Sequence, residues 1–173
     1  DGDTITGNIA VGYFKEKIQC NDRIQFIELE TDALPTSGSF QVFGFGMDTF
    51  PEVAGKDLKP VYALKFLESQ MYDAQKCETY FKTLLYFPRV PAGTFCGNTK
   101  DPQGSQCQLD QGGPFVDAST GRQVAVVSYV SPYCDLTRPA VYTSVPYYLD
   151  WIFQQLKPEN YHEYNPKKKP SWE

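Results

Sequence analysis

Histidine and cysteine, which often serve as catalytic base, thiol nucleophile or zinc ligand, are scarce in this chain. The 173 residues include one histidine, His162, and five cysteines. Covalent acyl transfer combines a nucleophile with a base, commonly a histidine that a carboxylate orients, but His162 lies in a polar tail after the last predicted helix. The cysteines include no Cys-x-x-Cys pair, so with a single histidine they form no zinc-binding set. We therefore expect no metal and no cofactor.

The cysteine content and the charge indicate where the protein works. Five is an odd number, so at least one cysteine has no intrachain partner. The wide spacing favours disulfides in an oxidising compartment, and we expect a secreted, extracellular protein. Asp1-Gly2-Asp3 is not an initiator methionine, which predicts processing from a precursor. The net charge of −5 argues against a nucleic-acid partner, and no apolar run approaches the length of a membrane span.

The pattern of residues predicts a loop-rich, all-β domain over residues 1–157, followed by a polar tail over residues 158–173. Thirteen glycines and thirteen prolines interrupt short apolar runs. Strands are expected at 24–30, 40–45, 61–66, 115–116, 124–130 and 140–145, with an edge strand in 1–19. A short helix is expected at 69–81 with Ser69 as its cap.

A C-terminal helix has the clearest periodicity. Its apolar residues are spaced i, i+3, i+4, i+7, with a proline near the start and another at the stop. These positions are Leu149, Ile152, Phe153, Leu156, Pro146 and Pro158.

Residues 107–114 read Cys-Gln-Leu-Asp-Gln-Gly-Gly-Pro. This stretch resembles the nucleophile loop of trypsin-like serine proteases, which reads Cys-Gln-Gly-Asp-Ser-Gly-Gly-Pro. Gln111 stands where the family has its nucleophilic serine, and an amide is not a nucleophile. Leu109 stands where the family has a glycine whose N–H lines the oxyanion hole. The resemblance therefore implies a loop without catalytic activity.

Other motifs follow the order of the family over about residues 20–156. Residues 42–46 are similar to its Gly-Trp-Gly strand end, and residues 128–130 stand where it has Ser-Trp-Gly. Residues 139–143 resemble Pro-Gly-Val-Tyr-Thr, and residues 148–152 resemble Tyr-Val-Asp-Trp-Ile. The resemblance implies a trypsin-like double antiparallel β-barrel with a C-terminal α-helix, in which the first barrel is incomplete in this chain.

The same resemblance implies two disulfides and an arthropod-like pattern. Cys77–Cys96 corresponds to the pair around the family's intermediate helix, and Cys107–Cys134 corresponds to the pair that braces the specificity pocket. A third pair, frequent in vertebrate members, would need cysteines near Phe40 and Asp117. Both are absent together, which is similar to arthropod members.

The specificity pocket is predicted to be degenerate. Val130 and Ala140 stand where the family has glycines on the pocket walls, and Ser105 stands at its base. A valine on the wall should fill the volume that a long substrate side chain requires.

Two alignments compete for the carboxylate that orients the base. The family reads Asn-Asp-Ile-Ala-Leu-Leu, whereas residues 21–27 read Asn-Asp-Arg-Ile-Gln-Phe-Ile. Without a gap, Arg23 takes the place of the aspartate; aligned on Asn-Asp, Asp22 takes it. The gapless alignment is preferred, because a slip of one residue turns every strand side chain to the other face.

In this alignment the family's catalytic histidine falls before Asp1, and most strands of the first barrel are missing. A partial barrel leaves unpaired strand edges. We therefore expect an N-terminal fragment of the same precursor to remain attached. Cys20 is the candidate for an interchain disulfide to this fragment, and a free thiol is the alternative.

Together these features predict a secreted, catalytically inactive homologue of serine proteases that binds a macromolecular protein partner. Its role would be that of a cofactor in an immune protease cascade or of a secreted or salivary effector. The alternative is an active serine-type endopeptidase completed by a separate N-terminal chain. A third hypothesis is a carrier that binds a small ligand in the cleft where the family binds its substrates.

Overall fold

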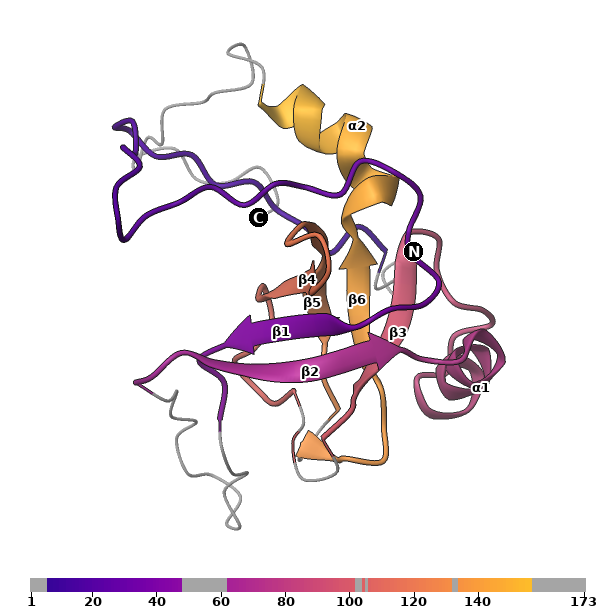
Figure 1. Ribbon diagram of the computed structural model, residues 1–173. Helices are drawn as coiled ribbons and strands as arrows, with labels where there is room; N and C mark the ends of the chain where they lie inside the picture. The colour runs from indigo at the N-terminus through magenta and orange to yellow at the C-terminus, as the bar shows by residue number, and fades with distance from the viewer. Residues whose placement is uncertain (1–5, 48–61, 102–103, 105, 132–133, 157–173) are drawn as a thin grey trace, which may run out of the picture.

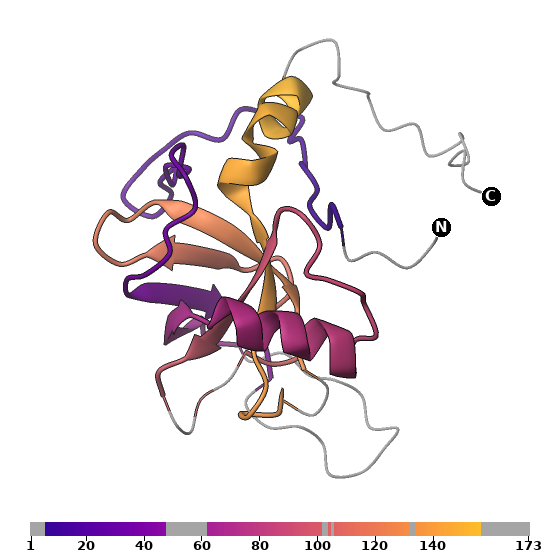
Figure 2. The ribbon, with the colours of Figure 1, turned by 90° about the vertical axis from the view of Figure 1, so that its right-hand side faces the viewer.

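The computed structural model describes residues 6–47, 62–101, 104, 106–131 and 134–156. Its centre is a closed barrel of six antiparallel strands in the order β1-β2-β3-β6-β5-β4. The strands are Phe40–Gly44 (β1), Lys65–Met71 (β2), Thr94–Thr99 (β3), Pro114–Asp117 (β4), Gln123–Tyr129 (β5) and Ala140–Ser144 (β6). Two helices, Ala74–Leu84 (α1) and Val145–Gln155 (α2), lie outside the barrel (Figures 1 and 2).

An aromatic cluster fills the barrel. Phe115 of β4 is fully buried and stacks on Phe40 of β1, with ring centroids 4.7 Å apart. The centroid of the Tyr142 ring of β6 lies 4.5 Å from that of Phe115. The Phe95 ring of β3 contacts the Phe115 ring edge-on, with centroids 5.7 Å apart. Four strands therefore share one packed centre, and aromatic pairs at these separations stabilise beyond the area that they bury.

Helix α1 is fixed to the barrel by a cap, a disulfide and a buried face. Asp73 is its N-cap and accepts a hydrogen bond of 2.8 Å from the N–H of Lys76. Cys77 is bonded to Cys96 of β3. Tyr80 and Phe81 are buried beside this disulfide, and burial raises the pKa of Tyr80 to about 12.

The sequence predicts several elements correctly. The strands expected at 40–45, 115–116, 124–130 and 140–145 correspond to β1, β4, β5 and β6. The C-terminal helix is confirmed as α2, with Pro146 in its first turn and Ser144 accepting from the N–H of Tyr147 at 3.3 Å. An all-β fold with a C-terminal helix is therefore confirmed.

Other elements differ from the expectation. The strand expected at 61–66 begins later, as β2, and Ser69 is a fully buried residue within β2 and no helix cap. The sequence does not predict strand β3, because Gly97 and Asn98 interrupt its apolar pattern. Gly97 suits this strand because a Cβ there would lie 2.9 Å from the Tyr142 ring.

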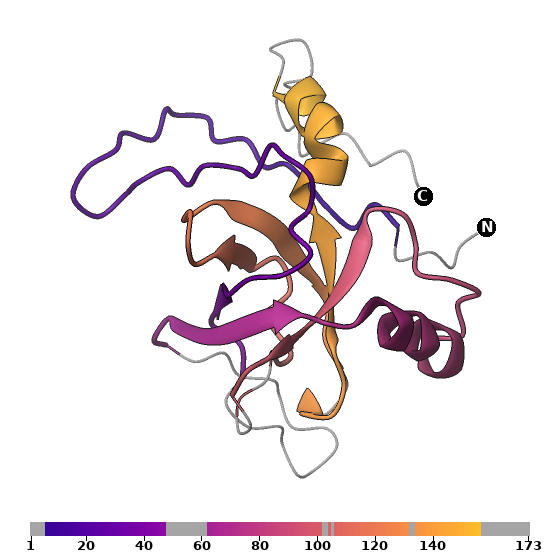
Figure 3. The ribbon, with the colours of Figure 1, turned by 45° about the vertical axis from the view of Figure 1, so that its right-hand side comes forward.

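Residues 6–39, called the arm below, contain no strand, so the strands expected at 24–30 and among residues 6–19 are wrong. Only isolated bridges occur there, including Leu29 with Gln123 of β5. The arm runs beside α2 and extends away from the barrel as a long loop (Figures 1 and 3). Every residue from 12 to 28 is exposed.

Neither described helix has the length and apolar character to cross a membrane. The polar tail expected at 158–173, with His162, lies outside the described residues, as does the start of the chain at Asp1.

Candidate functional site

Residues 107–114, called the loop below, lead into β4 and are held from both ends. Cys107 is bonded to Cys134, so both disulfides that the resemblance implies are present. The N–H of Gly112 donates to the carbonyl of Val127 at 2.9 Å, and the N–H of Val127 donates to the carbonyl of Gly113 at 2.9 Å. These bonds place the loop against β5, with residues 108–111 between the two attachments.

Asp110 anchors the loop from within. Its Oδ1 accepts from the N–H of Gly46 at 2.8 Å, and its Oδ2 accepts from the N–H of Cys107 at 2.9 Å. A Cβ at Gly44 or Gly46 would overlap this carboxylate. The two glycines at the end of β1 therefore make room for Asp110, and within the described residues it has no ion-pair partner.

A small cavity lies between this carboxylate and strands β1 and β2. Its volume is about 190 Å³, which is below the range of sites that hold a drug-sized ligand. Its lining includes Val42, Gly46, Phe66, Leu67, Gln106 and Asp110.

Leu109 and Gln111 interact with each other at the exposed side of the loop. The backbone of Leu109 has φ 76°, in the left-handed region that favours glycine, and the residue is 43% exposed. Its N–H donates to Oε1 of Gln111 at 3.0 Å. The N–H group that an oxyanion hole would direct at substrate is thus already hydrogen-bonded within the loop, and residue 111 offers no hydroxyl or thiol.

Asn8 is the polar residue by which the arm reaches the barrel near the loop. Its Nδ2 donates to Oγ of Ser128 at 2.9 Å and to the carbonyl of Ser128 at 3.2 Å. Its own carbonyl accepts from Oγ1 of Thr143 at 3.0 Å, and the N–H of Gly7 donates to the Tyr148 hydroxyl at 2.9 Å. Asn8 therefore bridges β5 and β6.

The structure does not bring Asp22 or Arg23 to the loop. Both are exposed residues of a turn organised by Asn21, whose Oδ1 accepts from the N–H groups of Arg23 and Ile24 at 2.8 and 3.1 Å. Among the described residues, no hydrogen bond or ion pair joins either side chain to residues 107–114 or to Ser128. Neither alignment of residues 21–27 is supported.

Asn8 is not among the site residues that the sequence analysis proposes, although a signal for it exists. The family's Asp-Ile-Ala-Leu matches residues 8–11, Asn-Ile-Ala-Val, with asparagine in place of aspartate and valine in place of leucine. The contact of Asn8 with Ser128, which stands where the family has Ser-Trp-Gly, favours this second match.

The other predicted site residues have different outcomes. Val130 and Ala140 are buried and pack in the same core cluster as Phe115 and Tyr142. Ser105 lies outside the described residues, so the degenerate pocket stays a prediction. Cys20 is an exposed free thiol. No cluster of three His, Cys, Asp or Glu residues suited to a metal occurs in the part of the chain that the structure describes.

Known proteins of one family are similar to this chain. The sequence pattern of the family described as "Trypsin" matches residues 1–152. Human "Serine protease 41" is 29% identical over 101 residues, which are 57% of this chain and 32% of that protein. "Trypsin eta" of Drosophila melanogaster is 29% identical over 92 residues (53% and 33%), and human "Kallikrein-11" is 26% identical over 132 residues (76% and 43%).

A solved structure shows the same fold. Neuropsin, a serine protease expressed in the limbic system of mouse brain, superposes with a TM-score of 0.66 at 22% identity, covering 83% of this chain and 59% of neuropsin. The chain spans between about a third and less than half of the length of the three curated relatives. With the family pattern over residues 1–152, the chain belongs to the trypsin family of serine proteases.

Proposed function

We propose that this chain is a catalytically inactive serine protease homologue that acts by binding a protein partner outside the cell. One observation carries the proposal. Gln111 stands at the family's nucleophile position and has no hydroxyl to present to a substrate. Its side chain instead accepts a hydrogen bond from the N–H of Leu109. The two disulfides support an oxidising, extracellular location.

The expected loss of activity is large. In serine proteases, removing the nucleophile costs about six orders of magnitude in turnover, or roughly 8 kcal/mol of transition-state stabilisation. An amide in place of the base-orienting carboxylate costs about four orders of magnitude in such enzymes. Asn8 would have that second effect if it occupies the aspartate's position beside Ser128. The losses do not add, but either one alone removes useful turnover.

A hydrolysis assay on the purified natural protein tests the proposal. We expect no release of chromophore from a panel of peptide amides with Arg, Lys, Tyr, Phe, Leu or Ala before the cleaved bond, with trypsin and elastase as positive controls. The variant Gln111→Ser is expected to stay inactive, because Leu109 and Asn8 are unchanged. Turnover by the natural protein that a serine-directed inhibitor abolishes would instead support the alternative, an active endopeptidase completed by a separate N-terminal chain.

The partner surface is proposed to lie on the arm. Phe14 and Phe26 are 74% and 72% exposed, and Ile18, Ile24 and Ile27 are exposed in the same segment. Large exposed apolar side chains concentrated in one segment favour a protein interaction site over isolated surface residues. A second polypeptide is the partner that we propose for this surface, with the exposed thiol of Cys20 as the point of covalent attachment.

Intact mass measurement of the natural protein, with and without reduction, tests the attachment. We expect reduction to release a second polypeptide, and Cys20→Ser to abolish the larger species in protein expressed from the full precursor. Cys134→Ser is no suitable control, because Cys134 is bonded to Cys107. A mass that reduction shifts only by the protons of the two internal disulfides contradicts the covalent link.

Capture of binding partners from arthropod haemolymph or saliva would then separate a role in an immune cascade from that of a salivary effector.

A further inference from the structure

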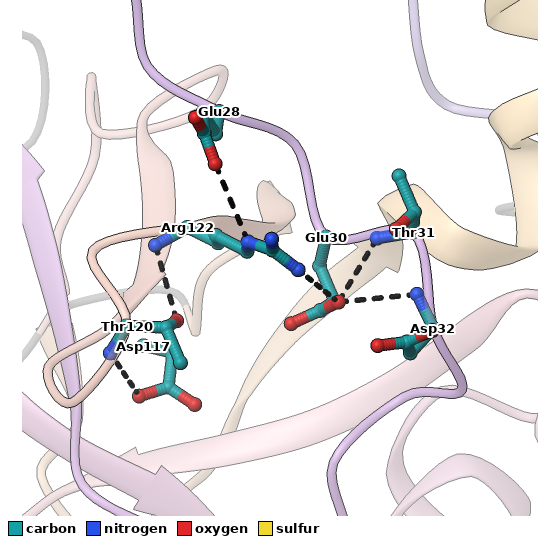
Figure 4. A network of polar contacts seen from close by, with 7 residues as sticks. All are labelled: Glu28, Glu30, Thr31, Asp32, Asp117, Thr120 and Arg122. Carbon is teal, nitrogen blue, oxygen red and sulfur yellow. Dashed lines mark hydrogen bonds and ion pairs between the residues drawn. The ribbon is translucent and has the colours of Figure 1, made fainter.

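Glu30 is a charged residue at an unusual place in the arm. It is 6% exposed, whereas every residue from 12 to 28 is exposed. Burying a carboxylate is unfavourable unless hydrogen bonds and an opposite charge compensate for the lost water. Glu30 therefore needs partners, and Figure 4 shows them converging on its side chain.

Three groups contact the Glu30 carboxylate. Its Oε1 accepts from the N–H groups of Thr31 at 2.9 Å and Asp32 at 3.1 Å. The same oxygen lies 3.6 Å from Nη1 of Arg122, in the turn between β4 and β5 (Figure 4). The contact joins residues 92 positions apart in the chain (122 − 30), so it ties the arm to the barrel.

Backbone hydrogen bonds continue the attachment on both sides of Glu30. Its N–H donates to the carbonyl of Gln123 at 2.9 Å, and the N–H of Gln123 donates to the carbonyl of Glu28 at 2.8 Å. Glu28 also approaches Arg122, with Oε2 3.5 Å from Nε, but its side chain is 80% exposed. Water screens such an exposed pair, so it contributes less than the pair with Glu30, whose carboxylate is buried although the Arg122 side chain is 37% exposed.

The turn that presents Arg122 is ordered by its own hydrogen bonds. Asp117 accepts from the N–H and the hydroxyl of Ser119 at 2.7 and 2.6 Å, and these bonds lower the pKa of Asp117. The N–H of Thr120 also donates to Asp117, and the N–H of Arg122 donates to Oγ1 of Thr120, both at 3.3 Å. Arg122 is therefore held in place from the barrel side.

We infer that Glu30 and Arg122 form a clamp that fixes the arm to the barrel, and that the arm opens as a unit separate from the barrel when the clamp is removed. Segments with few buried contacts open locally before the protein unfolds, and the arm has no strand of its own. The clamp would thereby hold the end of the arm at residues 28–32 against β5, while Asn8 keeps its own hydrogen bonds to Ser128 and Thr143. This inference does not depend on whether the site is catalytic.

Hydrogen exchange of the full chain, measured by mass spectrometry, tests the clamp. Glu30→Gln keeps the shape of the side chain and removes its charge. We expect peptides with residues 30–32, whose N–H groups are bonded at the clamp, to exchange about tenfold faster or more, with β6 and residues 124–129 of β5 unchanged. Glu28→Gln is the matched control, since it removes the exposed carboxylate on the same arginine, and its exchange should stay within about twofold of the natural protein.

A double-mutant cycle distinguishes a clamp from two independent effects. Arg122→Gln should reproduce the fast exchange of the arm, and the double variant Glu30→Gln/Arg122→Gln should exchange no faster than the larger single effect. Unchanged exchange of the arm in Glu30→Gln, additive single effects, or equal acceleration of the arm and the barrel strands would each overturn the inference. If Glu30→Gln does not fold, Arg122→Gln alone decides by the same comparison of arm and barrel.

Discussion

Phe115→Ala is expected to lower the free energy of unfolding by about 3–5 kcal/mol, the usual loss for a buried phenylalanine. The ring is fully buried at the centre of the barrel and contacts Phe40, Phe95 and Tyr142. Its removal would leave a cavity that these residues, which lie on three other strands, cannot fill without moving the backbone. Urea unfolding followed by tryptophan fluorescence and circular dichroism would measure the loss.

Phe153→Ala is the matched control, because it removes the same ring from α2, where Phe153 is 52% exposed. A loss below about 1 kcal/mol is expected there, as for surface positions in general. Equal losses at both positions would contradict the placement of Phe115 at the centre of the barrel.

Asp110→Ala is expected to lower the free energy of unfolding by about 2–4 kcal/mol. The carboxylate accepts two backbone hydrogen bonds, from Gly46 and Cys107. Bonds to a charged acceptor are stronger than neutral ones, and unpaired N–H groups left behind add their own cost. Asp150→Ala on the exposed face of α2 is the control and should change stability by less than about 0.5 kcal/mol.

A second variant tests the same contact from the other side. Gly46→Ala would place a methyl group against the Asp110 carboxylate and is expected to destabilise the protein as well. In the double variant Gly46→Ala/Asp110→Ala the methyl group has room, so its loss of stability should be clearly smaller than the sum of the two single losses. Additive losses would show that Asp110 does not occupy the space beside Gly46.

The sequence predicts the elements whose patterns are local. The i, i+3, i+4, i+7 spacing and Pro146 identify α2, and short apolar, β-branched runs identify β5 and β6. It does not predict β3, because Gly97 is suited to that strand only by the distant Tyr142 ring. Ser69 has the side chain of a helix cap but is buried by residues far along the chain, such as Gln106, which donates to it.

In the candidate site, too, the sequence predicts what local patterns determine and not what distant contacts determine. Leu109 and Gln111 could be identified from the sequence, because their neighbours in the loop keep the family pattern. Asn8 could not, because residues 21–22 offer an intact Asn-Asp pair that residues 7–8 lack. Only the contact of Asn8 with Ser128, which joins residues 120 positions apart, favours the match of the family motif at residues 8–11 over the match at residues 21–27.

Covalent labelling tests the central claim, that Gln111, at the family's nucleophile position, does not act as a nucleophile. The natural protein, with any attached chain, would be incubated with a fluorophosphonate, and the product examined by intact mass and peptide mapping. We expect no adduct on residues 107–114 under conditions that label trypsin completely, because Gln111 has no hydroxyl or thiol. Stoichiometric labelling of a serine or threonine next to this loop would contradict the claim and show a working nucleophile.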